Sequence, residues 1–260
     1  MNLSGDDTGV AIAAVEAGAD VVRRLFGQRL ERVDKGGGDF ATEADLAAER
    51  AILDVIRAAR PQDAVLGEEG GLQGAADAPR QWLVDPLCGT LNYAAGSTAV
   101  AVSAALRHGA AAVADPFGGE VFCTDGETAF ARRSGAERKL VPTPATGLVE
   151  VNLDVPYSTA PGFRAVDVLA HPDFGRYFRP RVMSTSLTLS WVAAGRRAGY
   201  VAGGRGMSLS VHFAAGVALC RAAGCVVTGI DGSPAGPDSD GLVVAADELT
   251  HSRLMSLVRR

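Results

Sequence analysis

The Trp-Leu-Val-Asp-Pro segment at residues 82–86 most constrains how this chain folds, because it joins a buried strand to a polar end. Three large apolar residues in succession are typical of a strand covered on both faces, and the Asp-Pro that follows cannot continue a central ladder. Gly89 then permits a positive φ, and Thr90 can cap the next helix. An isolated Asp-Pro often forms only a turn, in which the Asp85 side chain would accept hydrogen bonds from backbone amides of the turn. Evidence for a functional site therefore has to come from the neighbouring segments.

Two further acidic segments lie upstream of this strand. Glu68 and Glu69 follow a short apolar run at residues 64–66, and a third acidic cluster spans residues 39–45. Adjacent strand residues point to opposite faces, so only one of the two glutamates can share a face with Asp85. A divalent cation would offset the repulsion between such carboxylates.

Apolar periodicity predicts the elements around these segments. Residues 12–26 carry apolar side chains at spacings of three and four, which predicts a helix. A second helix over residues 48–59 follows a capping box of Thr42 and Asp45, so Asp45 is expected to be structural. The glycine-rich residues 35–39 between them are expected to form a mobile loop.

The rest of the chain predicts layered α/β packing. Alternating apolar segments from residue 99 to residue 130 predict a meander of antiparallel strands, whereas helices at 187–197 and 213–223 alternate with strands later on. The sequence predicts a single domain over residues 1–260, and a subdomain boundary is expected within the polar segment at 133–147.

Composition limits the classes of function. A chain of 260 residues with 47% hydrophobic and 21% charged residues is globular. Its net charge of -5, without a basic run, argues against nucleic acid as a partner. No stretch has the pattern of a signal peptide or a membrane span, so a cytoplasmic protein with reduced cysteines and no membrane partner is expected.

Four segments resemble motifs of the inositol monophosphatase family, within the lithium-sensitive, magnesium-dependent sugar phosphatase superfamily. Residues 39–45, 67–69 and 82–90 match D-x-V-T-x-x-D, G-E-E and W-[IV]-[IV]-D-P-[IL]-D-G-T, and residues 211–216 match W-D-x-A-A-G in part. Cys88 and His212 stand where the family has Asp. The resemblance implies an αβαβα sandwich, a phosphomonoester hydrolase and a homodimer.

The resemblance also implies a metal site. Glu68, Asp85 and the Leu87 carbonyl match the ligands of the family's first Mg²⁺, and all are hard oxygen donors. Of the three Asp ligands of the family's second metal, Asp85 remains, because Cys88 and His212 occupy the other two positions. The second site is therefore expected to be altered, either empty or suited to an ion such as Zn²⁺.

The remaining site residues also follow from the resemblance. Thr90, together with the carboxylate matched to Asp39, would orient the attacking water, and the amides of Gly89 and Thr90 would hold the phosphate. Ser184 lies in the segment matched to the substrate pocket. Arg205 aligns with an acidic residue that contacts inositol hydroxyls, and Arg offers only donors and a positive charge. A small phosphorylated or anionic metabolite other than inositol monophosphate is therefore the expected substrate.

The pair Cys88 and His212 leaves three interpretations open. With Asp85 they could bind zinc or iron, or they could act without metal as a nucleophilic dyad in a non-phosphatase enzyme. They could equally be inert in a one-metal phosphatase or in an inactive binding homologue. The first two interpretations require Cys88 and His212 to lie close together beside Asp85.

Overall fold

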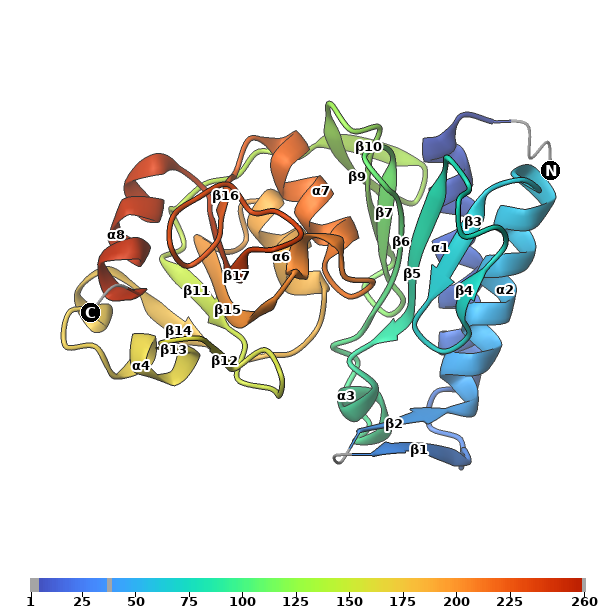
Figure 1. The fold of residues 1–260 in the computed structure, drawn as a ribbon, viewed down its shortest axis with the longest axis horizontal. Coiled ribbons are helices and arrows are strands. Elements are labelled where there is room, and N and C mark those ends of the chain that lie inside the picture. Colours follow the sequence, from blue (N-terminus) through green and yellow to red (C-terminus); the bar gives the residue numbers. More distant parts are fainter. Residues whose placement is uncertain (1–4, 37–38, 259–260) are drawn as a thin grey trace.

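The structure is a computed structural model that describes residues 5–36 and 39–258, and its elements stack as alternating layers of helix and sheet (Figure 1). Helices α1 and α2 cover the outer face of the larger sheet, α6 and α7 lie between the two sheets, and α4 and α8 cover the smaller sheet. This confirms the predicted αβαβα sandwich. Helix bounds are α1 (Asp7–Leu25), α2 (Glu43–Ala59), α3 (Thr90–Ala94), α4 (Ala165–Ala170), α5 (Phe174–Tyr177), α6 (Leu187–Ala193), α7 (Ala214–Ala223) and α8 (Glu248–Val258).

The larger sheet contains most of the first half of the chain. Its eight strands run in the order β10-β9-β8-β7-β6-β5-β3-β4, and β3 and β5 form its parallel pair. The strands are β3 (Ala64–Gly67), β4 (Gly71–Gln73), β5 (Gln81–Cys88), β6 (Ala101–Leu106), β7 (Ala111–Asp115), β8 (Glu120–Thr124), β9 (Ala129–Arg133) and β10 (Ala136–Lys139). The meander predicted from residue 99 to residue 130 is confirmed as β6 to β9.

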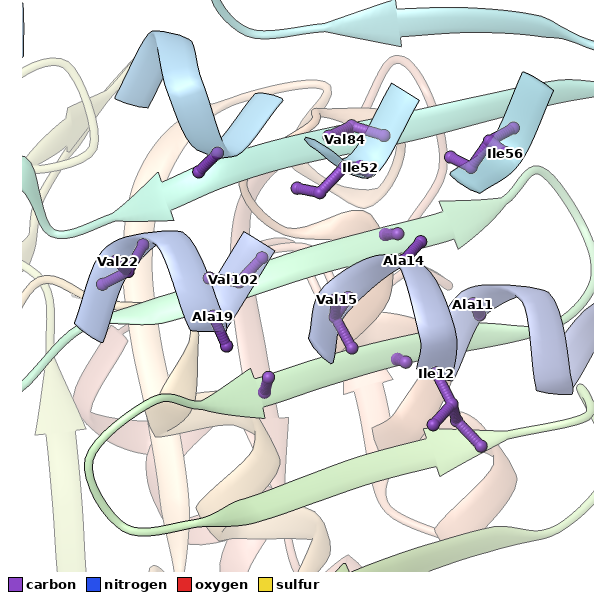
Figure 2. Close-up of a cluster of buried hydrophobic side chains, with 14 of the residues drawn as sticks. Ala11, Ile12, Ala14, Val15, Ala19, Val22, Ile52, Ile56, Val84 and Val102 are labelled. Carbon is purple, nitrogen blue, oxygen red and sulfur yellow. The ribbon is translucent and has the colours of Figure 1, made fainter. Parts of the chain in front are cut away.

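Strand β5 is buried on both faces, as its apolar run predicts. Trp82 and Val84 point into the core beneath α1 and α2, whereas Leu83 points toward the layer of α6 and α7. Figure 2 shows the first of these cores, where side chains from α1 and α2 meet Val84 of β5 and Val102 of β6. Because side chains alternate along a strand, Asp85 follows Leu83 onto the inner face. The polar end of the strand thus faces the middle helical layer.

The second half of the chain builds the smaller sheet, in the order β14-β11-β15-β17-β16. Its strands are β11 (Leu148–Val151), β14 (Arg179–Arg181), β15 (Gly199–Arg205), β16 (Val226–Thr228) and β17 (Asp240–Ala245), and a short hairpin of β12 (Thr159–Ala160) and β13 (Phe163–Arg164) lies beside it. The two sheets share a core through α6 and α7. In the described part of the chain, no helix is both long and apolar enough to cross a membrane.

Two local expectations are corrected. The loop expected over residues 35–39 is shorter than predicted, because residues on either side of it pair as an antiparallel hairpin of β1 (Arg32–Gly36) and β2 (Asp39–Thr42). Val33 and Phe40 supply strand-forming side chains to this hairpin. Residues 37–38 lie outside the described part. The helix predicted over residues 187–197 ends at Ala193. Gly195 adopts a positive φ of 72°, and the amide of Arg196 turns back to the carbonyl of Trp191.

Candidate functional site

Two carboxylates meet at the ends of neighbouring parallel strands. In the register of β3 and β5, Gly67 pairs with Val84, and the Glu68 amide donates to the Val84 carbonyl at 3.1 Å. Glu68 and Asp85 are therefore adjacent as the two strands leave the sheet. The Asp85 side chain is 0% exposed and that of Glu68 is 16% exposed. Glu68, and not Glu69, is the glutamate that lies beside Asp85.

His212 reaches these carboxylates from the middle layer. It lies between the 3₁₀ turn η1 (Met207–Leu209) and α7, which packs against the inner face of the larger sheet. Its Nδ1 lies 2.9 Å from Asp85 Oδ2 and 3.8 Å from Glu68 Oε2. One ligand atom from each of the three residues falls within 4.8 Å of the others, and the His212 side chain is 28% exposed. The group is thus buried at Asp85 and open to solvent at His212.

The turn after Asp85 is organised around the same carboxylate. Asp85 Oδ1 accepts the Leu87 amide at 3.2 Å, which leaves Oδ2 facing His212. The Thr90 hydroxyl lies 3.1 Å from the Leu87 carbonyl and 2.9 Å from Asp45 Oδ1. Asp85, Leu87 and Thr90 therefore form one connected polar turn.

Asp45 has a larger part in the site than the sequence pattern indicates. The predicted capping box is present: Asp45 Oδ2 accepts the Thr42 amide at 2.7 Å and the Thr42 hydroxyl at 2.6 Å. Its other oxygen accepts the Thr90 hydroxyl. Burial raises the pKa of Asp45, and hydrogen bonds from Thr42 and Thr90 oppose that rise. Thr90 was expected to act with Asp39, but the carboxylate that it contacts is Asp45; the Asp39 side chain lies outside the described residues.

Cys88 does not join the group of metal-ligand atoms. A bulge in the pairing of β5 with β6 separates it from Asp85, and its Sγ accepts the Ser186 amide at 3.1 Å. Within the described residues, the group of ligand atoms within 4.8 Å contains His212 with Glu68 and Asp85, and Cys88 is not a member. Burial raises the pKa of the Cys88 thiol well above its usual range, and Asp85 raises it further. This disfavours the thiolate that a metal-free nucleophile requires.

The predicted substrate residues Gly89 and Ser184 lie side by side. Gly89 has φ 101°, and a Cβ there would stand 3.2 Å from the carbonyl oxygens of both Ala99 and Ser184, so only glycine fits without movement. Asn92 Nδ2 donates to the same two carbonyls, at 2.9 and 3.1 Å. The start of α3 is thereby tied to the segment before α6.

Arg205 belongs to the smaller sheet. It is the last residue of β15, pairs with Asp240 in the β15–β17 register and is exposed. The structure gives no side-chain contact between Arg205 and the carboxylates of the site. Its predicted part in substrate binding therefore stays a prediction.

Two residues of the site escaped the sequence analysis. The carboxylate of Glu49 in α2 is 4% exposed and accepts the amides of Glu69 and Gly70 at 2.9 and 2.7 Å. It fixes the turn that presents Glu68, and its position one turn before the buried Leu53 was an available signal. The ring of Tyr157 packs edge-on against His212, with centroids 6.0 Å apart. No pattern in the sequence marks Tyr157.

Comparisons with known proteins agree with this geometry. The model of the inositol monophosphatase family matches residues 6–260. An inositol-1-monophosphatase, ImpA, of Mycolicibacterium smegmatis is 35% identical over 96% of this chain and 91% of its own length. The Nus factor SuhB of Vibrio cholerae is 30% identical over 90% of this chain and 88% of its own.

The solved structures agree on the fold. An inositol monophosphatase (IMPase) of Thermotoga maritima has a TM-score of 0.80 and 21% identity over 97% of this chain and 96% of its own. At that identity the likeness concerns architecture alone. The match over nearly the whole sequence, together with the carboxylates at the ends of β3 and β5, shows that this chain belongs to the inositol monophosphatase family, whose relatives named above include phosphoric monoester hydrolases.

Proposed function

We propose that this protein is a divalent-cation-dependent phosphomonoester hydrolase that acts on a small phosphorylated metabolite other than inositol monophosphate. The observation that carries the proposal is the group of Glu68, Asp85 and His212, which opens to solvent beside the hydrogen-bonded pair Thr90 and Asp45. Membership in a family with named phosphatases supports the reaction class.

The residues present fit a divalent cation. Two carboxylates and an imidazole converge within 4.8 Å, and a buried Asp85 beside Glu68 needs positive charge or donors nearby. Glu68, Asp85 and the Leu87 carbonyl are the predicted oxygen ligands for Mg²⁺, and the first two belong to this group. When bound, a divalent cation stabilises charge on the phosphoryl oxygens and makes an attacking water more acidic.

Thr90 and Asp45 are placed to handle the proton of that water. The Thr90 hydroxyl has one proton, and the Asp45 carboxylate at 2.9 Å is a stronger acceptor than the Leu87 carbonyl at 3.1 Å. Donation to Asp45 leaves the lone pairs of the Thr90 oxygen available to accept a hydrogen bond from water. The raised pKa of Asp45 makes it a better proton acceptor near neutral pH than an exposed aspartate. Asp45 is itself held by Thr42, which fixes the direction of the pair.

The substrate side supports an anionic metabolite. Gly89 and Thr90 begin α3 beside the Ser184 carbonyl and are the proposed phosphate contacts. Arg205 supplies a positive charge that would suit a second anionic group and would not accept a hydrogen bond from a polyol.

Phosphate release from a panel of phosphomonoesters, measured after treatment with EDTA and again after adding a divalent cation, tests this proposal. We expect cation-dependent turnover that Asp85→Asn reduces by about a hundredfold or more, because the central ligand loses its charge. Asp125→Asn, in an exposed hairpin turn, is the matched control and should leave turnover unchanged.

Absence of turnover on every ester, with the cation bound, would refute the phosphatase and leave the inactive binding homologue. The relatives named Nus factor SuhB motivate that alternative. A homodimer in the cytoplasm is part of the proposal, and light scattering on the purified chain tests the dimer.

A further inference from the structure

His212 changes the donor chemistry at the centre of the site. The family resemblance leads us to expect an Asp oxygen at this position, whereas the structure places an imidazole nitrogen 2.9 Å from Asp85 Oδ2. Mg²⁺ favours oxygen ligands, and imidazole is a ligand preferred by zinc, iron and other transition metals. The exchange of one atom type therefore bears on which ion the site selects.

We propose that Glu68, Asp85 and His212 form one mixed oxygen and nitrogen site that selects a transition-metal ion, Zn²⁺ or Mn²⁺, over Mg²⁺. The inference concerns the same site as the proposed hydrolase and rests on that proposed function. It goes further by naming the cation that the site binds. It differs from the Asp85, Cys88 and His212 set considered from the sequence, because Glu68 takes the place of the thiol.

The distances between donors suit a single ion. Ligand bonds of about 2.0–2.2 Å at angles between octahedral and tetrahedral put neighbouring donor atoms about 2.8–3.6 Å apart. From His212 Nδ1, the separation of 2.9 Å to Asp85 lies within that range, and the separation of 3.8 Å to Glu68 lies just above it. Small rotations of Glu68 and His212, which are 16% and 28% exposed, would bring all three atoms onto one ion while the buried Asp85 stays fixed.

A buried hydroxyl next to Asp85 is a second, independent observation. Ser103 of β6 pairs directly with Asp85 of β5, and both side chains lie on the inner face of the sheet. Ser103 is 1% exposed, and its Oγ has no hydrogen-bond partner among the described residues. A buried hydroxyl without a partner indicates a missing water or ion. The Ser103 hydroxyl therefore fits a bound ion, or a water held by that ion, next to Asp85.

Cys88 is excluded from the proposed site by its surroundings. Its sulfur accepts the Ser186 amide at 3.1 Å, and it lies outside the group formed by the other three residues. Removing the thiol should therefore leave metal affinity unchanged. This separates the proposed site from any site that uses a thiolate.

Calorimetric titration of the EDTA-treated chain with Zn²⁺, Mn²⁺ or Mg²⁺ alone tests the selectivity. We expect Zn²⁺ and Mn²⁺ to bind about a hundredfold more tightly than Mg²⁺, and His212→Asp to reduce Zn²⁺ affinity by about tenfold or more while Mg²⁺ affinity is kept or improved. Cys88→Ser and the control His171→Ala, at an exposed end of a helix, should each stay within about twofold of wild type, because neither contacts the group.

Nitrogen coupling in the electron spin resonance of bound Mn²⁺ gives a second readout that does not depend on affinity. The coupling should be present in the wild type and absent in His212→Asp. The proposal is overturned by Mg²⁺ affinity equal to that of Zn²⁺, by missing nitrogen coupling in the wild type, or by loss of Zn²⁺ affinity in Cys88→Ser. Phosphate release is measured separately, so selective binding without turnover refutes the hydrolase alone, and turnover with Mg²⁺ preferred refutes this inference alone.

Discussion

Asp45→Asn should lower the kcat of the enzyme strongly while it changes the free energy of unfolding only slightly. Asp45 accepts three hydrogen bonds, two from Thr42 and one from Thr90. In the variant, the side-chain oxygen can keep both bonds from Thr42, while the new amide group turns toward Thr90. The Thr90 hydroxyl then accepts from that amide and donates to the Leu87 carbonyl, which is 3.1 Å away. No buried group loses its partner, although the direction of one hydrogen bond is reversed.

The expected magnitudes follow from that exchange. Replacing charge-assisted bonds by neutral ones costs about 1 kcal/mol each, and relief of the buried charge offsets part of that cost, so Asp45→Asn should lie within about 1–2 kcal/mol of wild type in its free energy of unfolding. Asp45→Ala leaves the Thr42 amide and hydroxyl without their acceptor and should cost about 2–4 kcal/mol. The kcat of Asp45→Asn should nevertheless fall about 100-fold or more, because the proton path through Thr90 ends on an amide.

The assay combines urea unfolding with steady-state phosphate release at a saturating divalent cation. Asp63→Asn is the matched control: Asp63 is bonded to Arg80 and to the Trp82 indole at 2.8 Å, at the opposite end of β5 from Asp85, so it should affect stability and leave kcat unchanged. A kcat for Asp45→Asn within about threefold of wild type would refute the reasoning, because general acid–base help is worth more than that.

The pH dependence of stability checks the same residue. Burial raises the pKa of Asp45 above its ordinary value of 3.8, so the folded protein holds this proton more tightly than the unfolded chain does. The stability that this group contributes is complete below pH 3.8 and is lost as pH rises through the folded pKa. Asp45→Asn abolishes that loss, so the variant should gain stability relative to wild type as pH rises from 3.8 through the folded pKa; a constant difference between the two would contradict the raised pKa.

Three further predictions concern other parts of the site. Cys88 and Cys225 are both partly exposed, but the raised pKa of the Cys88 thiol means that Cys88 should react with iodoacetamide no faster than Cys225, and His212→Ala should not change its rate. Preferential labelling of Cys88 that His212→Ala slows would instead support a dyad. Glu49→Gln should lower the free energy of unfolding in urea by about 2 kcal/mol, since an amide group then faces one of two backbone donors. The same variant should weaken metal binding several-fold, and unchanged calorimetric affinity would show that metal binding by Glu68 does not need Glu49. Inositol monophosphate should be a poor substrate by kcat/KM, and Arg205→Glu should improve it, whereas its emergence as the best substrate of the wild type would contradict the proposed specificity.

Local sequence determined much of the fold. The apolar stripe in α1, the capping box of Thr42 and Asp45, and the doubly buried run before Asp85 each follow from spacing and side-chain type within a few residues. These features depend on residues that are close together along the chain, so they can be predicted directly from the sequence. The predicted helix over residues 187–197 is too long, because Gly195 adopts a positive φ, and Val141 and Thr143 from another segment lie so close that a Cβ at Gly195 would stand within 2.8 Å of them.

The sequence predicted which residues belong to the candidate site, but it predicted only part of their arrangement in space. The motifs named Glu68, Asp85 and His212, and the strand end made Asp85 a site residue. The parallel register of β3 and β5, which the linear sequence does not state, placed Glu68 beside Asp85. The same holds for Cys88, which a bulge between β5 and β6 turns toward Ser186.

Only the tertiary structure decided which groups act on one another. Asp45 serves as a helix cap by its sequence, yet it meets Thr90 across 45 residues because α2 packs beside the turn that follows β5. Glu49 supports the Glu68 turn from the same helix, and His212 arrives from the opposite half of the chain, 127 residues from Asp85. Side-chain type sets what each residue can do, whereas contacts between distant segments depend on packing that no local pattern encodes.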